Sequence, residues 1–378
     1  MLYLSLSYTS APSSNSPVLN MPYQLEDAFS GRHFLMPSAV AVLPGQRTFA
    51  IAETGAHRVS LLSTSGHFIR ALKAPRGSVA YSKMPLYHPM GVAVPDSESV
   101  IVADSFNSRI VRLSISDGRP LANATSARTH FGAGLTALRY PKGLAYVSHE
   151  WPPFGKLPLL YVADYGNSRI CTFAVGDFSQ KGFSLPGPVA AVSNGQLVPL
   201  LCFGSGPGNG GGGQMDRPTA IAVGEVGGNL RIFVADTFND RVQEWIFATA
   251  TTTFRHIRDL GASGTAAAQF RRPVGVALLP SAHGELVTSR LFVTESAGRR
   301  AQVFAADGRA LQVITPPHAP GSARAPGAAG PGRLGGVCVA VRGNMDSWRD
   351  PHRLILIGRE RSQVFVYRYR QHGAEHKQ

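Results

Sequence analysis

The sequence contains few cysteines and no long apolar segment. Three cysteines occur among 378 residues, at Cys171, Cys202 and Cys338, and no CxxC pair or other spacing suited to a structural zinc site is present. Three cysteines cannot all pair with one another, so we expect unpaired thiols and an intracellular, reducing compartment. No run of about 20 apolar residues occurs, which predicts that no helix spans a membrane.

The N-terminal residues also lack a feature that secreted proteins have. Residues 1–22 carry no positive charge ahead of their short apolar part, so they make a poor secretory signal. We interpret residues 1–22 as a flexible polar lead.

Acidic residues are scarce. The chain has 23 Asp and Glu against 37 Lys and Arg, a net charge of +14. A basic surplus concerns the choice of partner rather than the fold, and it favours an acidic ligand such as nucleic acid or an acidic protein.

Recognisable metal and cofactor motifs are absent as well. The twelve histidines are scattered, and no GxSxG, HExxH or P-loop motif is present. Residues 206–211 formally fit GxGxxG, but a predicted strand rather than a helix follows at Pro218, so they indicate a loop. The sequence therefore predicts no metal and no cofactor.

Glycine and proline are plentiful, at 41 and 27 residues, and they punctuate a repeat. Each copy begins with a proline and a short apolar strand, at Pro89, Pro141, Pro218 and Pro273. A second apolar strand follows and ends in an acid, most often as Val-Ala-Asp. Then comes the pattern D-x-x-N-x-R, found at Asp104/Asn107/Arg109, Asp164/Asn167/Arg169 and Asp236/Asn239/Arg241, with a weaker copy at Glu295/Gly298/Arg300.

Two further copies are more divergent. One starts at Pro37 and continues to Glu53 and Arg58, and the other starts at Leu334 and ends near Tyr367. Six copies of short strands at a spacing of roughly 50 to 70 residues are typical of a β-propeller rather than a helical solenoid.

These motifs resemble the NHL repeat family over residues 37–369. The resemblance implies an all-β fold, a six-bladed β-propeller of four-stranded antiparallel blades. We expect one domain over 23–370, with blade cores near 37–72, 89–121, 141–175, 218–247, 273–314 and 334–369, and a tail at 371–378. The last copy lacks a fourth strand, so we predict that an N-terminal strand from residues 23–34 pairs onto the last blade and closes the ring.

The motif itself predicts an architectural role. The Asp can accept backbone N–H groups within its turn, the Asn tolerates a left-handed conformation there, and the Arg can pair with the Asp. We therefore interpret these residues as structural rather than catalytic.

The turn after the acid and the linker before the proline are expected to share one face of the propeller, because the first strand leaves that face and the second returns to it. Loops carry function more often than strands do. The candidate partner-binding residues on this loop face are Arg139, Lys142, Arg217, Arg271, Arg272, Arg299, Phe106, Tyr165 and Phe238. Interleaved aromatic and basic residues suit single-stranded RNA. In the alternative interpretation the rings pack between blades and the arginines are merely solvated.

An enzymatic function is the competing hypothesis. The repeat is similar to that of peptidylglycine amidating lyase, in which zinc-binding histidines follow the opening proline. Here those positions hold Ser38, Met90, Lys142, Thr219 and Val274. We therefore predict a non-catalytic scaffold that docks a protein or single-stranded RNA, as a monomer or as part of a larger assembly. The alternative is a metal-dependent propeller lyase or hydrolase.

Overall fold

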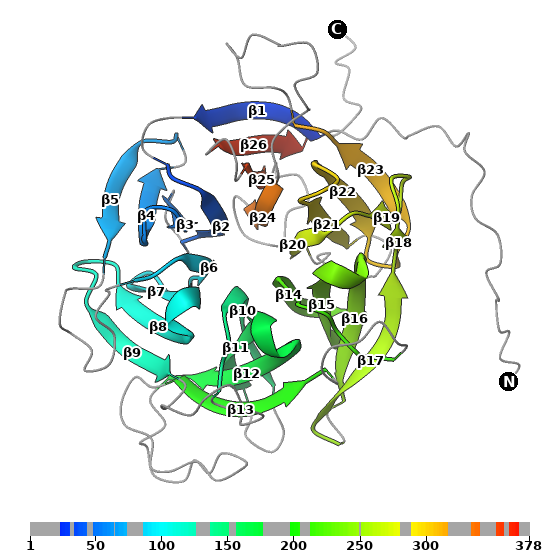
Figure 1. Cartoon of the computed structure of the whole chain (residues 1–378), viewed down its shortest axis with the longest axis horizontal. Coiled ribbons are helices and arrows are strands. Elements are labelled where there is room, and N and C mark those ends of the chain that lie inside the picture. Colours follow the sequence, from blue (N-terminus) through cyan, green and yellow to red (C-terminus); the bar gives the residue numbers. More distant parts are fainter. Residues whose placement is uncertain are drawn as a thin grey trace, which may run out of the picture.

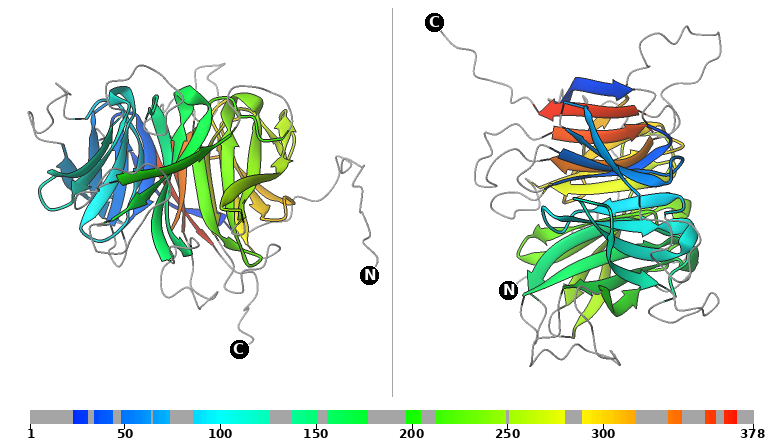
Figure 2. Two further views of the ribbon diagram at one scale, coloured as in Figure 1. Left: turned by 90° about the horizontal axis from the view of Figure 1, so that it is seen from below. Right: turned by 90° about the vertical axis from the view of Figure 1, so that its left-hand side faces the viewer.

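The computed structural model describes residues 23–30, 34–43, 48–63, 65–73, 86–125, 137–150, 156–176, 197–204, 212–248, 251–279, 289–316, 334–340, 353–358 and 363–369. Within these residues, five antiparallel sheets each contain four consecutive strands, and we call them blades I to V in chain order. The blades stand around a central axis (Figure 1), and their strands run between the two faces of a disc (Figure 2).

The strands of each blade follow one another in sequence from the axis outward. Blade I consists of β2 (Pro37–Val42), β3 (Thr48–Glu53), β4 (Arg58–Ser63) and β5 (Phe68–Leu72). Blade II consists of β6 (Pro89–Ala93), β7 (Ser99–Asp104), β8 (Arg109–Ser114) and β9 (Pro120–Thr125). Blade III consists of β10 (Pro141–Glu150), β11 (Lys156–Asp164), β12 (Arg169–Val175) and β13 (Leu197–Phe203).

Blades IV and V follow the same plan. Blade IV consists of β14 (Ala220–Val226), β15 (Asn229–Asp236), β16 (Arg241–Ala248) and β17 (Thr253–Leu260). Blade V consists of β20 (Pro273–Leu279), β21 (Arg290–Glu295), β22 (Arg300–Ala305) and β23 (Ala310–Ile314). Between these blades lies a short parallel pair, β18 (Ala262–Ser263) and β19 (Gln269–Phe270).

A further four-stranded sheet, which we call the terminal sheet, combines strands from both ends of the chain. It consists of β24 (Leu334–Ala340), β25 (Arg353–Gly358), β26 (Gln363–Tyr369) and β1 (Tyr23–Ser30). β1 is antiparallel to β26, with Tyr23 opposite Tyr369 and Ser30 opposite Gln363. The innermost strands contact one another in the order β2, β6, β10, β14, β20 and β24, and β24 also contacts β2.

The apolar core lies between neighbouring sheets. Val59 of blade I packs in one cluster with Val100 and Val111 of blade II, and Phe49 of blade I packs in another with Ile355 of the terminal sheet. β7 is buried at all of its residues. The sequence of a strand that is covered on both faces is a continuous apolar run, which explains the Val/Ile/Ala composition of the second strands.

Small residues in the innermost strands let the blades approach one another. A Cβ on Gly143 would lie 2.6 Å from Ala220 Cα, and the Gly143 N–H donates to the Thr219 carbonyl of blade IV at 2.9 Å. Likewise, a Cβ on Gly336 would lie 2.7 Å from the Ser38 carbonyl oxygen. At these two positions a side chain would therefore collide with the neighbouring innermost strand, and only glycine fits.

The prediction of an all-β propeller with four-stranded antiparallel blades is confirmed. The lead at 1–22, the tail at 371–378 and the glycine-rich segment 206–211 lie outside the described residues. None of the described helices is long and apolar enough to cross a membrane.

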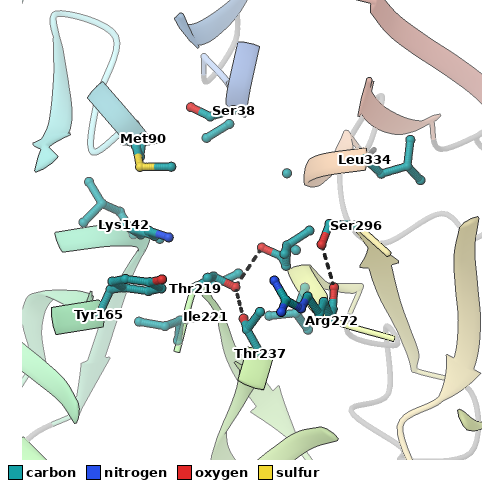
Figure 3. Close-up of a pocket in the computed structure, with 18 of the residues that line it drawn as sticks. Ser38, Met90, Lys142, Tyr165, Thr219, Ile221, Thr237, Arg272, Ser296 and Leu334 are labelled. Carbon is teal, nitrogen blue, oxygen red and sulfur yellow. Dashed lines mark hydrogen bonds between the residues drawn. The ribbon is translucent and has the colours of Figure 1, made fainter. Parts of the chain in front are cut away.

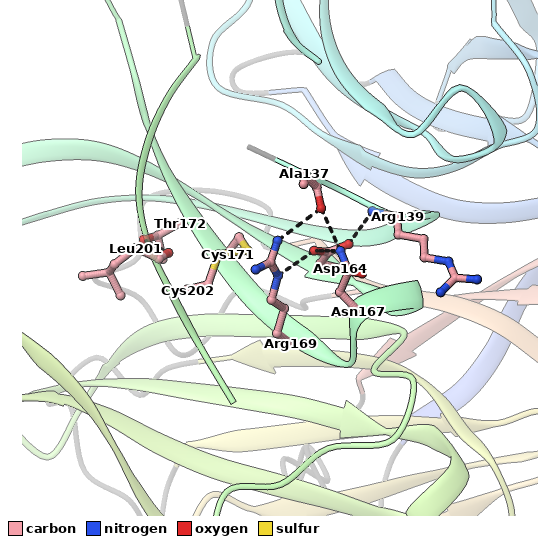
Figure 4. The surroundings of a disulfide bond; sticks show 9 residues. All are labelled: Ala137, Arg139, Asp164, Asn167, Arg169, Cys171, Thr172, Leu201 and Cys202. Atoms are coloured by element: carbon pink, nitrogen blue, oxygen red, sulfur yellow. Dashed lines mark hydrogen bonds and ion pairs between the residues drawn. A yellow bond between two sulfur atoms is a disulfide. The ribbon is translucent and has the colours of Figure 1, made fainter. Parts of the chain in front are cut away.

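The expectation of three unpaired cysteines is wrong. Cys171 and Cys202 lie directly opposite each other on β12 and β13, and a disulfide joins them (Figure 4). The cysteine argument for a reducing compartment therefore loses its basis.

Candidate functional site

The acid that ends each second strand binds three N–H groups of its own blade, an arrangement that we call the acid clamp. In blade III, Asp164 Oδ1 accepts the Arg139 backbone N–H at 2.6 Å (Figure 4). Asp164 Oδ2 accepts Asn167 Nδ2 and Arg169 Nε, each at 2.8 Å. The same three kinds of contact surround Asp104 and Asp236.

The divergent copies keep the clamp. Glu53 accepts the Leu35 backbone N–H at 2.9 Å and pairs with Arg58 at 3.0 Å. Glu295 accepts the Arg271 backbone N–H at 2.8 Å and pairs with Arg300 at 2.7 Å. An acid–arginine pair is thus present in every one of blades I to V.

The source of the backbone N–H corrects one expectation. The sequence predicted that the acid accepts N–H groups within its own turn. In blade III the N–H comes instead from Arg139, in the linker before the opening proline. Pro141 lies opposite Asp164 across the first two strands and brings that linker within reach. The acid therefore ties the start of its blade to the end of the second strand.

The conformation of the asparagines corrects a second expectation. We predicted a left-handed backbone at the motif asparagines, but the structure places it at the next residue in each copy. The asparagines concerned are Asn107, Asn167 and Asn239, and the left-handed residues are Ser108, Ser168 and Asp240, with φ of 50°, 53° and 52°.

Each asparagine is instead the last residue of a short 3₁₀ turn, and its amide donates back to the acid three residues earlier. In blade IV, the turn Thr237–Asn239 brings Asn239 Nδ2 to 2.9 Å from Asp236 Oδ2. Asn107 and Asn167 make the equivalent bonds at 2.8 Å. The asparagine is therefore required by its side chain and not by tolerance of a left-handed backbone.

Burial dominates the electrostatics of the clamp. Loss of solvation raises the pKa of Asp104, Asp164 and Asp236, and their arginine, asparagine and backbone partners oppose that rise without cancelling it. All three acids have no exposed surface and face donors of their own blade. The contacts named for these acids therefore all join parts of their own blade.

The left-handed residues also fix the linker of the following blade. The Arg217 backbone N–H donates to Ser168 Oγ at 3.2 Å, and the Arg272 backbone N–H donates to Asp240 Oδ1 at 2.7 Å. His57 has the same place in blade I, where its Nδ1 accepts the His88 backbone N–H at 3.1 Å. In these three cases a blade positions the residue that precedes the opening proline of the next.

A pocket opens where the innermost strands begin, at the axis of the loop face (Figure 3). Its volume is about 260 Å³, and residues of β2, β6, β10, β14, β20 and β24 line it. Lys142 and Arg272 are the cationic residues of this axial pocket, and the described lining includes no Asp, Glu, His or Cys. The remaining wall is hydroxyl-bearing or apolar, with Ser38, Thr219 and Met90 among its members.

Cations lie on aromatic rings around the mouth of the pocket. Lys142 Nζ is 3.3 Å from the centre of the Tyr165 ring. The guanidinium groups of Arg217 and Arg272 are 4.7 and 4.8 Å from the centre of the Phe238 ring. These contacts hold positive charge at the surface in defined positions.

A second aromatic group continues from the pocket toward blades I and II. Phe106 is 51% exposed, and its ring lies 5.5 Å from Tyr140 and 4.5 Å from His88. Tyr87 and His57 complete this aromatic cluster. Phe106 therefore contacts the neighbouring linker and still presents a ring to solvent.

The other predicted residues differ in their surroundings. Arg139 provides a backbone N–H to the clamp, while its guanidinium points away from Asp164 (Figure 4). Arg271 is exposed, and its carbonyl accepts N–H groups of the turn after Glu295. Arg299 has a left-handed φ of 55° in that turn. The predicted residues that the structure brings together at the axial pocket are Lys142, Tyr165, Arg217, Arg272 and Phe238.

Several residues of this face were missed by sequence reasoning. The predictions did not single out His57, Tyr87 or His88 as aromatic neighbours of Phe106, although His88 directly precedes an opening proline. An alignment of the repeats would have placed His88 at the same linker position as Tyr140, Arg217 and Arg272, which also precede an opening proline. Among the described residues, no group of three or more His, Cys, Asp or Glu could hold a metal ion.

Comparisons with known proteins give structural similarity only. No protein-family profile matches the chain, and no curated protein sequence matches it. The solved structure of a proposed gluconolactonase matches with a TM-score of 0.54 and 13% identity, and the match covers 95% of this chain and 98% of that chain. An auxiliary nutrient binding protein from Bacteroides thetaiotaomicron has a TM-score of 0.53 and 12% identity, with 89% and 70% covered.

A virginiamycin B lyase from Staphylococcus aureus, with a TM-score of 0.47 and 10% identity, also matches over 92% of this chain and 100% of that chain. At sequence identities this low, the similarity shows a shared fold and nothing further. Together with the sheet topology, the two similarities above a TM-score of 0.5 identify the chain as a β-propeller.

Proposed function

We propose that the protein is a non-catalytic binding module, a six-bladed propeller of the NHL type, whose loop face binds single-stranded RNA. The terminal sheet is the sixth blade in this proposal, and β1 closes the ring. Support comes from the pairing of β1 with β26 and from the contacts of β24 with both β2 and β20. The repeated D-x-x-N-x-R clamp supports the family assignment.

The observation that carries the proposed activity is the combination of cations and rings on one face. Lys142 lies on Tyr165, and Arg217 and Arg272 lie on Phe238. Phe106 and Tyr140 are 51% and 37% exposed beside them. Bases stack on exposed rings while neighbouring cations hold phosphates, and each stacked base contributes about 1–3 kcal/mol.

The test is fluorescence anisotropy with a random single-stranded RNA pool at about 50 and 200 mM salt. Wild type is compared with an Arg271→Glu/Arg272→Glu variant. A charge-matched control is Arg119→Glu/Arg255→Glu, because both residues are exposed and lie away from the axial pocket. We expect RNA binding by the wild type to weaken by orders of magnitude at high salt. The loop-face variant should bind more weakly than the wild type, and the control variant should bind almost as tightly as the wild type.

Other results would redirect the proposal. No binding at either salt concentration would exclude RNA and favour an acidic protein partner. Equal losses in the two variants would mean that net charge alone attracts RNA, and the loop face would lose its role.

A second candidate is a propeller enzyme such as a lactone hydrolase, in line with the proposed gluconolactonase that shares the fold. Its catalytic groups would have to come from the axial pocket, and Lys142 is one of the charged residues of its described lining. Hydrolysis of gluconolactone, with and without added divalent metal ions, tests this candidate. A rate that depends on Lys142 would favour the enzyme over the scaffold.

A further inference from the structure

Blade III differs from the other four blades in residue type at two positions of the repeat. The residue after the acid is a small hydroxyl residue in blades I, II, IV and V, namely Thr54, Ser105, Thr237 and Ser296. The Thr54 and Thr237 hydroxyls donate to the carbonyls of Pro89 and Pro273 in the next blade, at 2.9 and 2.7 Å. Blade III has Tyr165 instead and gives up that inter-blade bond.

The second exception lies directly beside the first. The residue after the opening proline is uncharged in the other blades, where it is Ser38, Met90, Thr219 or Val274, whereas blade III has Lys142. The two exceptional side chains contact each other, with Lys142 Nζ 3.3 Å from the Tyr165 ring centre. In a repeat protein, positions at which one copy differs from the shared pattern are expected to be functional sites.

Both exceptional side chains point into the axial pocket. Figure 3 shows the Lys142 ammonium and the Tyr165 hydroxyl directed inward from one side, with the Arg272 guanidinium on the other. Two cations therefore face a half-enclosed space whose described lining has no acid. Ammonium, guanidinium and phenol groups all donate hydrogen bonds, so the site has the chemistry of an anion receptor.

The rest of the wall is partly apolar and partly hydroxyl-bearing. Met90, Ile221 and Leu334 line the pocket, and the Thr219 hydroxyl is already engaged with Thr237 at 2.6 Å. A cavity of about 150 Å³ accommodates one benzene ring. A pocket of about 260 Å³ thus has room for a ring and one carboxylate, but is smaller than most sites for drug-sized ligands.

We propose that the axial pocket binds a small organic carboxylate with a flat apolar body. Its carboxylate lies between Lys142, Tyr165 and Arg272, and its apolar part lies against Met90, Ile221 and Leu334. This proposal goes beyond the proposed RNA activity. The two ligands share Lys142, Tyr165 and Arg272, but a ligand of this size needs only the pocket and not the surrounding aromatic cluster.

The probe is benzoate, with the dissociation constant measured by ligand-observed NMR. Benzamide has the same shape without the charge, and inorganic phosphate has charge without the ring. We expect saturable binding of benzoate, binding of benzamide weaker by about tenfold or more, and weak binding of phosphate.

Each variant copies the residue that another blade has at the same position, so each is compatible with the fold. Lys142→Met copies Met90, Tyr165→Thr copies Thr54, and Arg272→Met copies Met36, whose φ of 51° matches the 53° of Arg272. We expect Lys142→Met and Arg272→Met each to weaken benzoate about tenfold or more, and Tyr165→Thr to weaken it less. Arg255→Met, on the outermost strand β17, is the control and should leave benzoate binding unchanged.

Three results would overturn the proposal: no saturable benzoate binding, equal binding of benzoate and benzamide, or an unchanged dissociation constant in Lys142→Met. The RNA experiment measures a different ligand, so the failure of one proposal can be told from the failure of the other. Weaker benzoate binding in Tyr165→Thr with RNA binding retained would show that the two ligands depend differently on this side chain.

Discussion

Replacing Asp104 by Asn tests whether the acid clamp stabilises its blade. Asp104 has no exposed surface, and Arg109 is 2% exposed. The carboxylate accepts the Tyr87 backbone N–H at 2.6 Å, Asn107 Nδ2 at 2.8 Å and Arg109 Nε at 2.5 Å. Asn keeps the shape but removes the charge and places an NH₂ group where an acceptor is needed.

The expected cost follows from this burial. Removing one partner of a buried ion pair costs about 3–5 kcal/mol, because the other charge stays in the interior without compensation. The matched control is Asp96→Asn in the same blade. Its Arg112 pair is 19% and 40% exposed, so its loss should cost no more than about 1 kcal/mol.

Urea unfolding followed by circular dichroism measures both variants. A lower midpoint at unchanged slope reports a loss of stability. If Asp104→Asn lowers the free energy of unfolding no more than Asp96→Asn does, the clamp does not stabilise the blade, and the motif needs another explanation.

Three further predictions concern other parts of the fold. Gly143→Val should lower the free energy of unfolding by about 1–3 kcal/mol or more, measured by urea unfolding, because its Cβ would lie 2.6 Å from Ala220 Cα. Cys202→Ser should cost about 3–4 kcal/mol for a bond that spans 31 residues, and wild type in reductant should then unfold like the variant. Burial opposes ionisation of Asp96, but the Glu98 and Ser99 N–H groups, the Ser99 hydroxyl and Arg112 outweigh it, so its pKa is lowered. The stabilisation from Asp96 is therefore present above about pH 4, the ordinary pKa range of the carboxyl, and is lost as pH falls through the lowered pKa. Thermal unfolding measured over this pH range should show a smaller loss of stability on acidification in Asp96→Asn than in the wild type.

The repeat made the blades predictable from sequence because strand and turn signals are local. Val-Ala-Asp followed by Asn and Arg at fixed spacing defines a second strand, a turn and a third strand wherever it occurs. Even Glu53 and Glu295, in the divergent copies, make the same ion pairs. Here local pattern and tertiary structure agree.

Contacts that depend on register could not be predicted in this way. The Cys171–Cys202 bond requires that β12 and β13 align at one particular residue, and the length and packing of their connection set that alignment. The N–H that Asp164 accepts comes from Arg139, 25 residues away in sequence. The Lys142–Tyr165 pair was visible only as two separate candidates, because nothing local indicates that the two side chains touch.

The position of β1 has a consequence for the order of folding during synthesis. β1 is made before blades I to V, but its partner β26 is made after them. Blades I to V each consist of consecutive strands and can pair as they leave the ribosome, whereas β1 must wait until all five blades have been made. During translation β1 therefore presents an unpaired edge, and a chaperone that binds extended segments would find its target there.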